Sequence, residues 1–320
     1  MYFNYFCRMK ALPHKTKQLF VFIAKLLVVG GAFYFIYIRL ADSGQFDLSH
    51  LNEGLSAPNA TLYISLILLL TILNRFLEIL KWKALADTLQ PISLGQSTAQ
   101  VLAAVTAAIF TPNGLGEYAA KAFYYKKEDA KQVIFLNLIC NGLQMIIAAL
   151  AGLTGLVAFN ALYNVIPTQL LLLILAGISA VAVLLFASRN ITIKGYSLKK
   201  LGEKINELPK SVHRNNMLLA LLRYGCIIHQ HYLLFVFFGV SIPYPVMIAA
   251  ISGIYFLGSA LPSFTFIDFA VRGSVAVYFF GILGVNEWIV VLAATLQWLL
   301  NIVLPVVVGS YFVLTFKRKL

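Results

Sequence analysis

Two short stretches of an otherwise apolar chain place an acidic residue four positions before a basic one. Glu117 precedes Lys121 in FTPNGLGEYAAKAF, and Asp268 precedes Arg272 in LPSFTFIDFAVRGSVAVYFFGILGV. Residues at i and i+4 share a helical face, where such a pair contributes only about 0.2–0.5 kcal/mol in water. Inside a bilayer an ionised side chain costs several kcal/mol and persists mainly when it is paired or faces water. The two pairs therefore predict a hydrated, substrate-binding cavity within a membrane protein.

Helix-breaking residues surround both pairs. Pro112 cannot continue a preceding helix, and Gly114 and Gly116 permit turn dihedrals that other residues resist. Pro262 precedes the second pair in the same way. Asn113 lies in the first turn, whose N–H groups would open a new helix and suit an anionic headgroup. The alternative for the first stretch is an amphipathic helix at the membrane surface with an exposed ion pair.

Further polar residues fall within apolar segments. Arg75 and Glu78 either join a network with the first charged pair or pair locally, with the arginine reaching the interface. Asn137, Asn141 and Gln144 share a helical face and either line the cavity or form hydrogen bonds between helices. Gln297 and Asn301 are the corresponding amides in the span that follows the second charged pair, and we count them among the candidate substrate-binding residues. The cysteines and histidines show no metal-ligand spacing, so we expect neither a metal nor a cofactor.

Composition places the chain among polytopic helical membrane proteins. Apolar residues make up 60% of the 320, and charged residues only 12%, about half the usual share for a soluble domain. Six apolar segments have the length of about 20 residues that crosses a bilayer: 18–38, 60–80, 132–158, 168–187, 217–239 and 288–315.

The net charge of +13 does not indicate nucleic-acid binding, because the basic residues flank the apolar segments. Connections 41–59, 159–167 and 240–246 contain no Lys or Arg. The positive-inside rule then predicts cytoplasmic termini and a basic face toward anionic headgroups. The location that we expect is the inner (cytoplasmic) membrane of a bacterium.

Counting crossings predicts two re-entrant hairpins. Residues 95–111 are too short to span comfortably and have basic flanks, so this hairpin enters from the cytoplasm, whereas 244–284 enters from outside. The fold class is then an all-α polytopic membrane protein with about six full transmembrane helices and two re-entrant hairpins in an inverted-topology repeat. Eight full crossings are the alternative.

This reading divides one integral membrane domain, 1–320, into four parts. An N-terminal anchor helix and outer loop (1–59) precede repeat 1 (60–158). A connecting helix and a basic cytoplasmic loop (159–216) lead to repeat 2 (217–320).

The chain resembles the transmembrane region of the lysylphosphatidylglycerol synthase/flippase family. The resemblance rests on LNRFLEILKWKAL (73–85), FTPNGLGEYAAKAF (110–123) and LPSFTFIDFAVRGSVAVYFFGILGV (261–285). It implies that both charged pairs contact a lipid headgroup or stabilise broken helices around it. Members that synthesise aminoacylated lipids carry a soluble catalytic domain in addition, so the resemblance implies a stand-alone flippase-like protein that is not an enzyme.

The leading hypothesis is a transporter that moves a phospholipid or a polyprenyl-phosphate-linked glycolipid between leaflets. A membrane-embedded lipid-modifying transferase, with one of the two acids as base, is the alternative from the enzyme class. A third is a non-transporting assembly partner of a lipid or glycan synthesis complex, with the basic loop as docking site. Lipids are the expected partners, and a homo-oligomer is left open.

Overall fold

A computed structural model describes residues 49–109, 111, 114–192, 197–260 and 265–316, and all regular structure in these ranges is helical. Five segments are long and apolar enough to cross a membrane. They are α4 (Ala60–Ala86), α7 (Ala130–Tyr163), α8 with η2 (Thr168–Asn190), α10 (Lys210–Phe237) and the continuous α13–η3–α14 (Glu287–Thr315). Each coincides with a predicted span. The predicted span 18–38 lies outside the described residues.

Two pairs of shorter helices interrupt this series. α5 (Leu94–Ala108) and α6 (Gly116–Ala122) pack against each other, as do α11 (Tyr244–Ala260) and α12 (Thr265–Ile282). α5 begins at a capping box in which the Ser93 hydroxyl accepts from the Gln96 N–H at 3.1 Å, and the Gln96 side chain accepts from the Ser93 N–H at 2.7 Å. These helix pairs occupy the positions of the two predicted hairpins.

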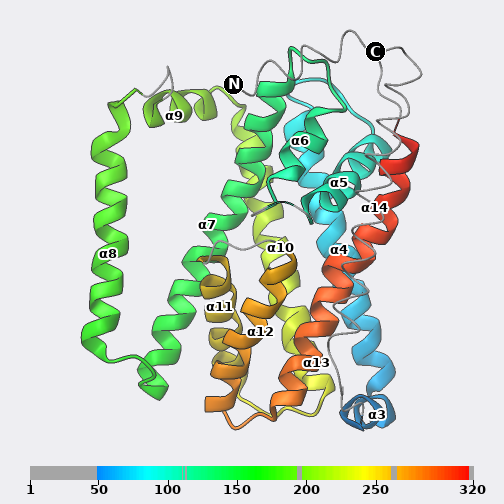
Figure 1. The fold of residues 1–320 in the computed structure, drawn as a ribbon, viewed down its shortest axis with the longest axis vertical. Coiled ribbons are helices and arrows are strands. Elements are labelled where there is room, and N and C mark those ends of the chain that lie inside the picture. The colour runs from blue at the N-terminus through cyan, green and yellow to red at the C-terminus, as the bar shows by residue number, and fades with distance from the viewer. Residues whose placement is uncertain (1–48, 110, 112–113, 193–196, 261–264, 317–320) are drawn as a thin grey trace.

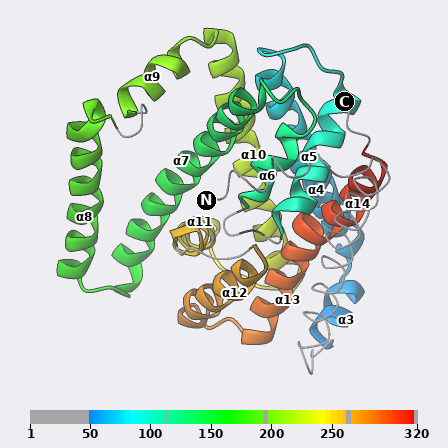
Figure 2. The ribbon, with the colours of Figure 1, turned by 45° about the horizontal axis from the view of Figure 1, so that its top comes forward.

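The two short pairs lie at opposite ends of the bundle (Figure 1). α5 and α6 lie beside the end where α9 (Leu198–Asn206) crosses, and α11 and α12 lie toward the end that carries α3 (Ser49–Ser56). The turned view in Figure 2 keeps this separation. Each pair therefore lies at its own end of the bundle.

Helix pairings in one half of the chain have counterparts in the other half. α4 packs along α10, α5 packs on α14, and α11 packs on α7. α6 likewise contacts α7, and α12 contacts α13. When residues 60–163 are exchanged with 210–315, the α5–α14 contact becomes the α11–α7 contact, the α6–α7 contact becomes the α12–α13 contact, and the α4–α10 contact is unchanged.

Glycines allow close packing at two of these contacts, α14 on α5 and α7 on α11. A Cβ on Gly309 of α14 would collide with the Leu102 carbonyl of α5. A Cβ on Gly155 of α7 would lie 2.7 Å from the Ala249 carbonyl of α11. Small residues at such positions let backbones approach, which is how helices associate where lipid removes the hydrophobic driving force.

Charge and exposure distinguish the ends and sides of the bundle. The described connections at the α3 end, 164–167, 239–243 and 283–286, contain no Lys or Arg, whereas α9 carries three lysines. α8 stands apart from the other spanning helices in both views, and Leu172, Leu173 and Leu184 on it are more than half exposed. Such an apolar surface suits contact with lipid chains.

Candidate functional site

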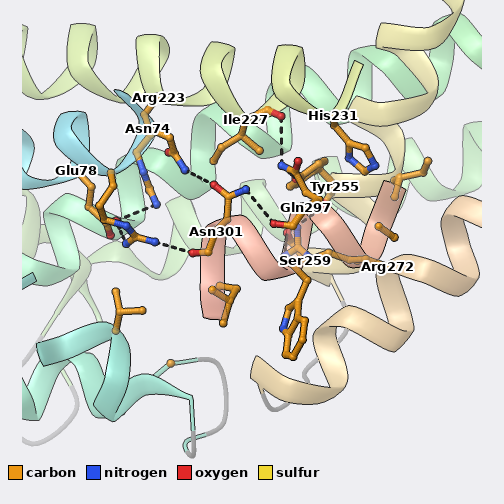
Figure 3. Close-up of a pocket in the computed structure, with 18 of the residues that line it drawn as sticks. Asn74, Glu78, Arg223, Ile227, His231, Tyr255, Ser259, Arg272, Gln297 and Asn301 are labelled. Atoms are coloured by element: carbon orange, nitrogen blue, oxygen red, sulfur yellow. Dashed lines mark hydrogen bonds and ion pairs between the residues drawn. The ribbon is translucent and has the colours of Figure 1, made fainter. Parts of the chain in front are cut away.

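A cavity of about 620 Å³ lies between the two halves of the chain (Figure 3). Its lining includes Gly114 and Glu117 from the α5–α6 pair, and Ser259 and Arg272 from the α11–α12 pair. The rest comes mainly from α4, α10 and α13 with η3. The structure thus brings residues of both short helix pairs to one polar space.

An ion-pair cluster forms one end of the cavity. Glu78 of α4 pairs with Arg75 on its own helix and with Arg223 of α10, the latter at 3.3 Å. The three side chains are only 7%, 14% and 16% exposed. The predicted local Arg75–Glu78 pair is therefore present. Arg75 also contacts η3 (Leu299–Val303) through the Asn301 carbonyl.

Arg75 reaches a backbone carbonyl that the sequence leaves free. Its Nη2 donates to the Asn301 carbonyl at 2.7 Å. In a regular α-helix that carbonyl would accept from the N–H of residue 305, but Pro305 has none. Asn301 also lies within η3 (Leu299–Val303), a π-helical turn of the kind that recurs at functional sites. The proline therefore opens the acceptor that the arginine uses.

A ladder of side-chain amides crosses the wall of the cavity. Asn74 Nδ2 donates to Asn301 Oδ1 at 2.7 Å, and Asn301 Nδ2 donates to Gln230 Oε1 at 2.9 Å. Gln230 in turn donates to the Thr71 hydroxyl at 2.5 Å. One helical turn from Asn301, Gln297 Nε2 donates to the Tyr255 hydroxyl at 3.1 Å. The ladder joins α4, α10, α11 and α13, so it couples both halves.

The first charged pair, Glu117 and Lys121, is formed, but only Glu117 lines the cavity. Lys121 Nζ donates to Glu117 Oε1 at 2.6 Å and to Asn137 Oδ1 at 2.7 Å, and it lies 4.4 Å from the ring centre of Trp82. Lys121 is fully buried, while Glu117 lines the cavity. Lys121 therefore binds the Glu117 carboxylate from the protein interior and does not line the cavity.

The turn before α6 does not offer the free N–H groups that its sequence suggests. The Gly116 N–H donates to the Thr111 hydroxyl at 2.7 Å, and the Glu117 N–H donates to the Gly114 carbonyl at 3.0 Å. The Tyr118 N–H donates to the Leu115 carbonyl at 3.2 Å. Gly114 has a positive φ of 69°, which makes this tight turn accessible. An anion at this turn would have to displace bonds within the chain.

An aromatic and amide cluster beside Lys121 positions its neighbours. Trp82 Nε1 donates to Gln100 Oε1 at 2.6 Å, and the Tyr125 hydroxyl donates to the same oxygen at 3.0 Å. Burial raises the pKa of Tyr125 to about 12, so the phenol remains a neutral donor. The cluster fixes the ring over which the lysine lies.

Arg272 occupies the other end of the cavity. Its Nη2 donates to the Ser259 hydroxyl at 3.3 Å, and its guanidinium lies 5.0 Å from the centre of the Tyr255 ring. His231 is nearby, stacked on Phe235 at 5.3 Å and edge-on to Tyr255 at 5.9 Å. Figure 3 shows this group separated from the Glu78 cluster by the amide ladder.

The structure sorts the sequence-predicted residues into three groups. Those that line the cavity are Arg75, Glu78, Gly114, Glu117, Arg272, Gln297 and Asn301. Those outside the lining are Gly116, Lys121, Asn137 and Asn141. Those that lie outside the described residues are Pro112, Asn113, Pro262 and the side chain of Asp268.

Other lining residues escaped the sequence reading. Arg223 lies about 20 Å along α10 from Lys210, the first residue of this helix. The position of Arg223 inside the apolar segment 217–239 can be seen in the sequence, and it indicates a buried partner. Asn74, His231 and Tyr255 gave no comparable signal. Lys81, directly after the predicted span 60–80, is fully buried and donates to Gln144 Oε1 at 3.1 Å.

Positive charge exceeds negative charge in the described lining. Arg75, Arg223 and Arg272 contribute three cations, and both lining carboxylates are already paired, Glu78 with arginines and Glu117 with Lys121. Within the described part of the chain, no group of three or more His, Cys, Asp or Glu side chains could hold a metal ion. The arrangement favours an anionic ligand held by guanidinium groups.

Comparison with known proteins gives no relative from which to transfer a function. No protein-family model matches the chain, and a search of curated proteins finds no match.

Proposed function

We propose that the protein is a lipid transporter that moves a phospholipid or a polyprenyl-phosphate-linked glycolipid between membrane leaflets. The observation that carries this proposal is the cavity, which is lined by Arg75 and Arg223 at one end and by Arg272 at the other, between short helix pairs that lie at opposite ends of the bundle. Planar guanidinium groups suit phosphate, which they bind through two parallel hydrogen bonds. Apolar helix surfaces around the bundle suit the acyl chains.

In this proposal α5–α6 and α11–α12 are re-entrant hairpins of an inverted-topology repeat. The exchange of helix pairings between the two halves supports it, as does the opposite placement of the two short pairs. Together with the predicted span 18–38, the five candidate spans give six full crossings. Transporters of this architecture bind substrate near the midplane, where the two repeats meet.

The proposed orientation puts α9 and both termini in the cytoplasm of a bacterium. The lysines of α9 and the absence of Lys and Arg from the described connections at the α3 end support it. The same lysines would contact anionic headgroups of the inner leaflet.

In the proposed mechanism the empty site is neutralised internally, and the substrate phosphate replaces part of that neutralisation. Arg75 and Arg223 bind the phosphate, while Glu78 holds them together when the site is empty. Arg272 adds a third cation from the other hairpin. One repeat then rocks against the other and changes the side to which the cavity opens. The resemblance to the lysylphosphatidylglycerol synthase/flippase family supports lipid as the substrate.

The experiment is a translocation assay in proteoliposomes that contain a fluorescent anionic phospholipid. Dithionite added outside quenches only the outer leaflet, so a transporter raises the quenched fraction above one half. Arg223→Gln should reduce the initial rate at least about tenfold, because it removes one of the two guanidinium groups that bind the phosphate in this proposal.

The matched control is Lys83→Gln, which removes the same charge from an exposed pair with Asp87. It should leave the rate within about twofold. Wild-type protein that never exceeds the protein-free quenched fraction contradicts the transporter, and turnover of lipid in detergent would favour a transferase.

A further inference from the structure

Buried polar atoms without a hydrogen-bond partner concentrate on residues that line the cavity. Within the described residues, buried side-chain nitrogen and oxygen atoms without a hydrogen-bond partner include six from the lining: Asn74 Oδ1, Arg75 Nε, Arg223 Nε, Gln297 Oε1 and both ring nitrogens of His231. An unpaired buried polar group costs about 1–3 kcal/mol, so such groups normally have a partner. Their clustering at one space indicates that a polar ligand completes them.

The orientation of the two amides follows from their backbone partners. Asn301 Nδ2 donates to the Gln297 carbonyl at 2.9 Å, so its Oδ1 must face Asn74. Asn74 therefore presents nitrogen to Asn301 and keeps its own Oδ1 as an open acceptor. Gln297 Nε2 donates to the Ile227 carbonyl at 3.5 Å, which leaves Gln297 Oε1 open as well. The cavity thus needs hydrogen-bond donors from its ligand in addition to an anion.

The charges decide which kind of donor fits. An ammonium group beside the phosphate would meet Arg75 and Arg223, and both described carboxylates of the lining are occupied, Glu78 by these two arginines and Glu117 by Lys121. Neutral hydroxyl groups can donate to Asn74 and Gln297 without this repulsion, and they can pair with His231, which both donates and accepts when neutral. A volume of about 620 Å³ also exceeds what a bare phosphate fills.

We propose that the site selects a phosphate headgroup that carries neutral hydroxyl groups, such as a glycerol or a sugar, over a bare phosphodiester or an ammonium-bearing headgroup. This rests on the proposed function and specifies its substrate class. The phosphate lies against Arg75 and Arg223. The hydroxyl groups lie along Asn74 and Gln297 toward His231 and Arg272.

The test is a set of dissociation constants for lipids with identical acyl chains, titrated into the detergent-purified protein. Phosphatidylglycerol and phosphatidylmethanol carry the same single negative charge and differ in hydroxyl groups, while phosphatidylethanolamine adds an ammonium. Phosphatidylglycerol should bind about fivefold or more tightly than either, because one or two hydrogen bonds separate them. A polyprenyl-phosphate-linked sugar is the second hydroxylated probe. The tighter of the two hydroxylated lipids identifies the natural source.

Two variants at one position make the test specific. Gln297→Leu should abolish the preference for phosphatidylglycerol while leaving phosphatidylmethanol binding within about twofold. Gln297→Glu supplies an unpaired carboxylate and should shift the preference toward phosphatidylethanolamine, a gain that misfolding cannot produce. Gln132→Leu, at an exposed amide outside the cavity, is the matched control and should change nothing.

Equal affinity for phosphatidylglycerol and phosphatidylmethanol, or loss of both in Gln297→Leu, would overturn the inference. Translocation without hydroxyl selectivity would overturn it too and leave the transporter intact. Hydroxyl-selective binding without translocation would instead contradict the proposed transporter and leave a lipid-binding site.

Discussion

Arg75 of α4 donates a hydrogen bond to the main-chain carbonyl of Asn301 at 2.7 Å, and this bond joins the first half of the chain to the second across the cavity. The carbonyl is available because Pro305, four residues on, has no N–H. Pro305 of α14 therefore leaves open the carbonyl that holds the Arg75 guanidinium of α4.

Pro305→Ala should restore the helical N–H to the Asn301 carbonyl and compete with Arg75. A hydrogen bond to a charged group contributes about 1.5–3 kcal/mol, so we expect translocation to slow about tenfold or more. The melting temperature in detergent should stay equal or rise, since a helix breaker is removed. Parallel measurement of both separates this outcome from misfolding. A lower melting temperature with an unchanged rate would show that the bond has no part in transport.

Lys121→Met should destabilise the protein by about 3–5 kcal/mol, because it leaves Glu117 in a buried site without its cation. The double variant Lys121→Met with Glu117→Gln should recover most of that loss, since no unpaired charge remains. Thermal melting of the three proteins gives the coupling. Additive effects of the two substitutions would contradict a pair that acts as a unit.

Gly309→Val should disrupt the contact between α14 and α5, where an added side chain meets the Leu102 carbonyl. Overpacking of this kind typically costs about 1–3 kcal/mol, and here backbone has to move. Gly142→Val is the control, because nothing lies within 4 Å of a Cβ at that position of α7. The two variants should differ clearly in the melting temperature and in the yield of monodisperse protein. Equal behaviour would argue against close packing of α5 on α14.

Alkaline pH should destabilise the connection between α6 and α7. Burial raises the pKa of Tyr124 and of Tyr125 to about 12, from 10.0. A raised folded-state pKa means that the unfolded chain releases these protons first, so stability holds below pH 10 and falls between about 10 and 12. Tyr125→Phe should flatten this fall when the melting temperature is followed from pH 9 to 11. A parallel pH dependence in both proteins would exclude Tyr125 as a contributor.

The sequence predicted the elements better than the faces they present. Length and apolarity located α8 to the residue, 168–187, because a bilayer requires about 20 apolar residues. The spacing of Glu117 and Lys121 also correctly predicted an ion pair. Spacing within one helix cannot tell which neighbour a side chain meets, however. Lys121 therefore faces Asn137 and Trp82 instead of the cavity.

The composition of the cavity wall depends on contacts between distant segments. Asn74 meets Asn301, and Arg223 meets Glu78, only once α4, α10 and α13 are packed together. Residue spacing within one helix does not predict contacts between side chains that are more than 100 residues apart in the chain. The depth of Arg223 in its helix was the exception, since a cation that far from an interface needs a buried partner.

The most direct test of the account is the side of the membrane on which the flanks of each hairpin lie. Single cysteines at Gln90 and Lys127 bracket α5–α6, and cysteines at Ser241 and Glu287 bracket α11–α12; all four positions are exposed. They are introduced after Cys7, Cys140 and Cys226 are replaced by alanine, and labelled with an impermeant thiol reagent in vesicles of both orientations. The account predicts that Gln90 and Lys127 label only from the cytoplasmic side, and Ser241 and Glu287 only from the outside. If the two members of either pair label from opposite sides, that segment crosses the membrane and the inverted repeat is wrong.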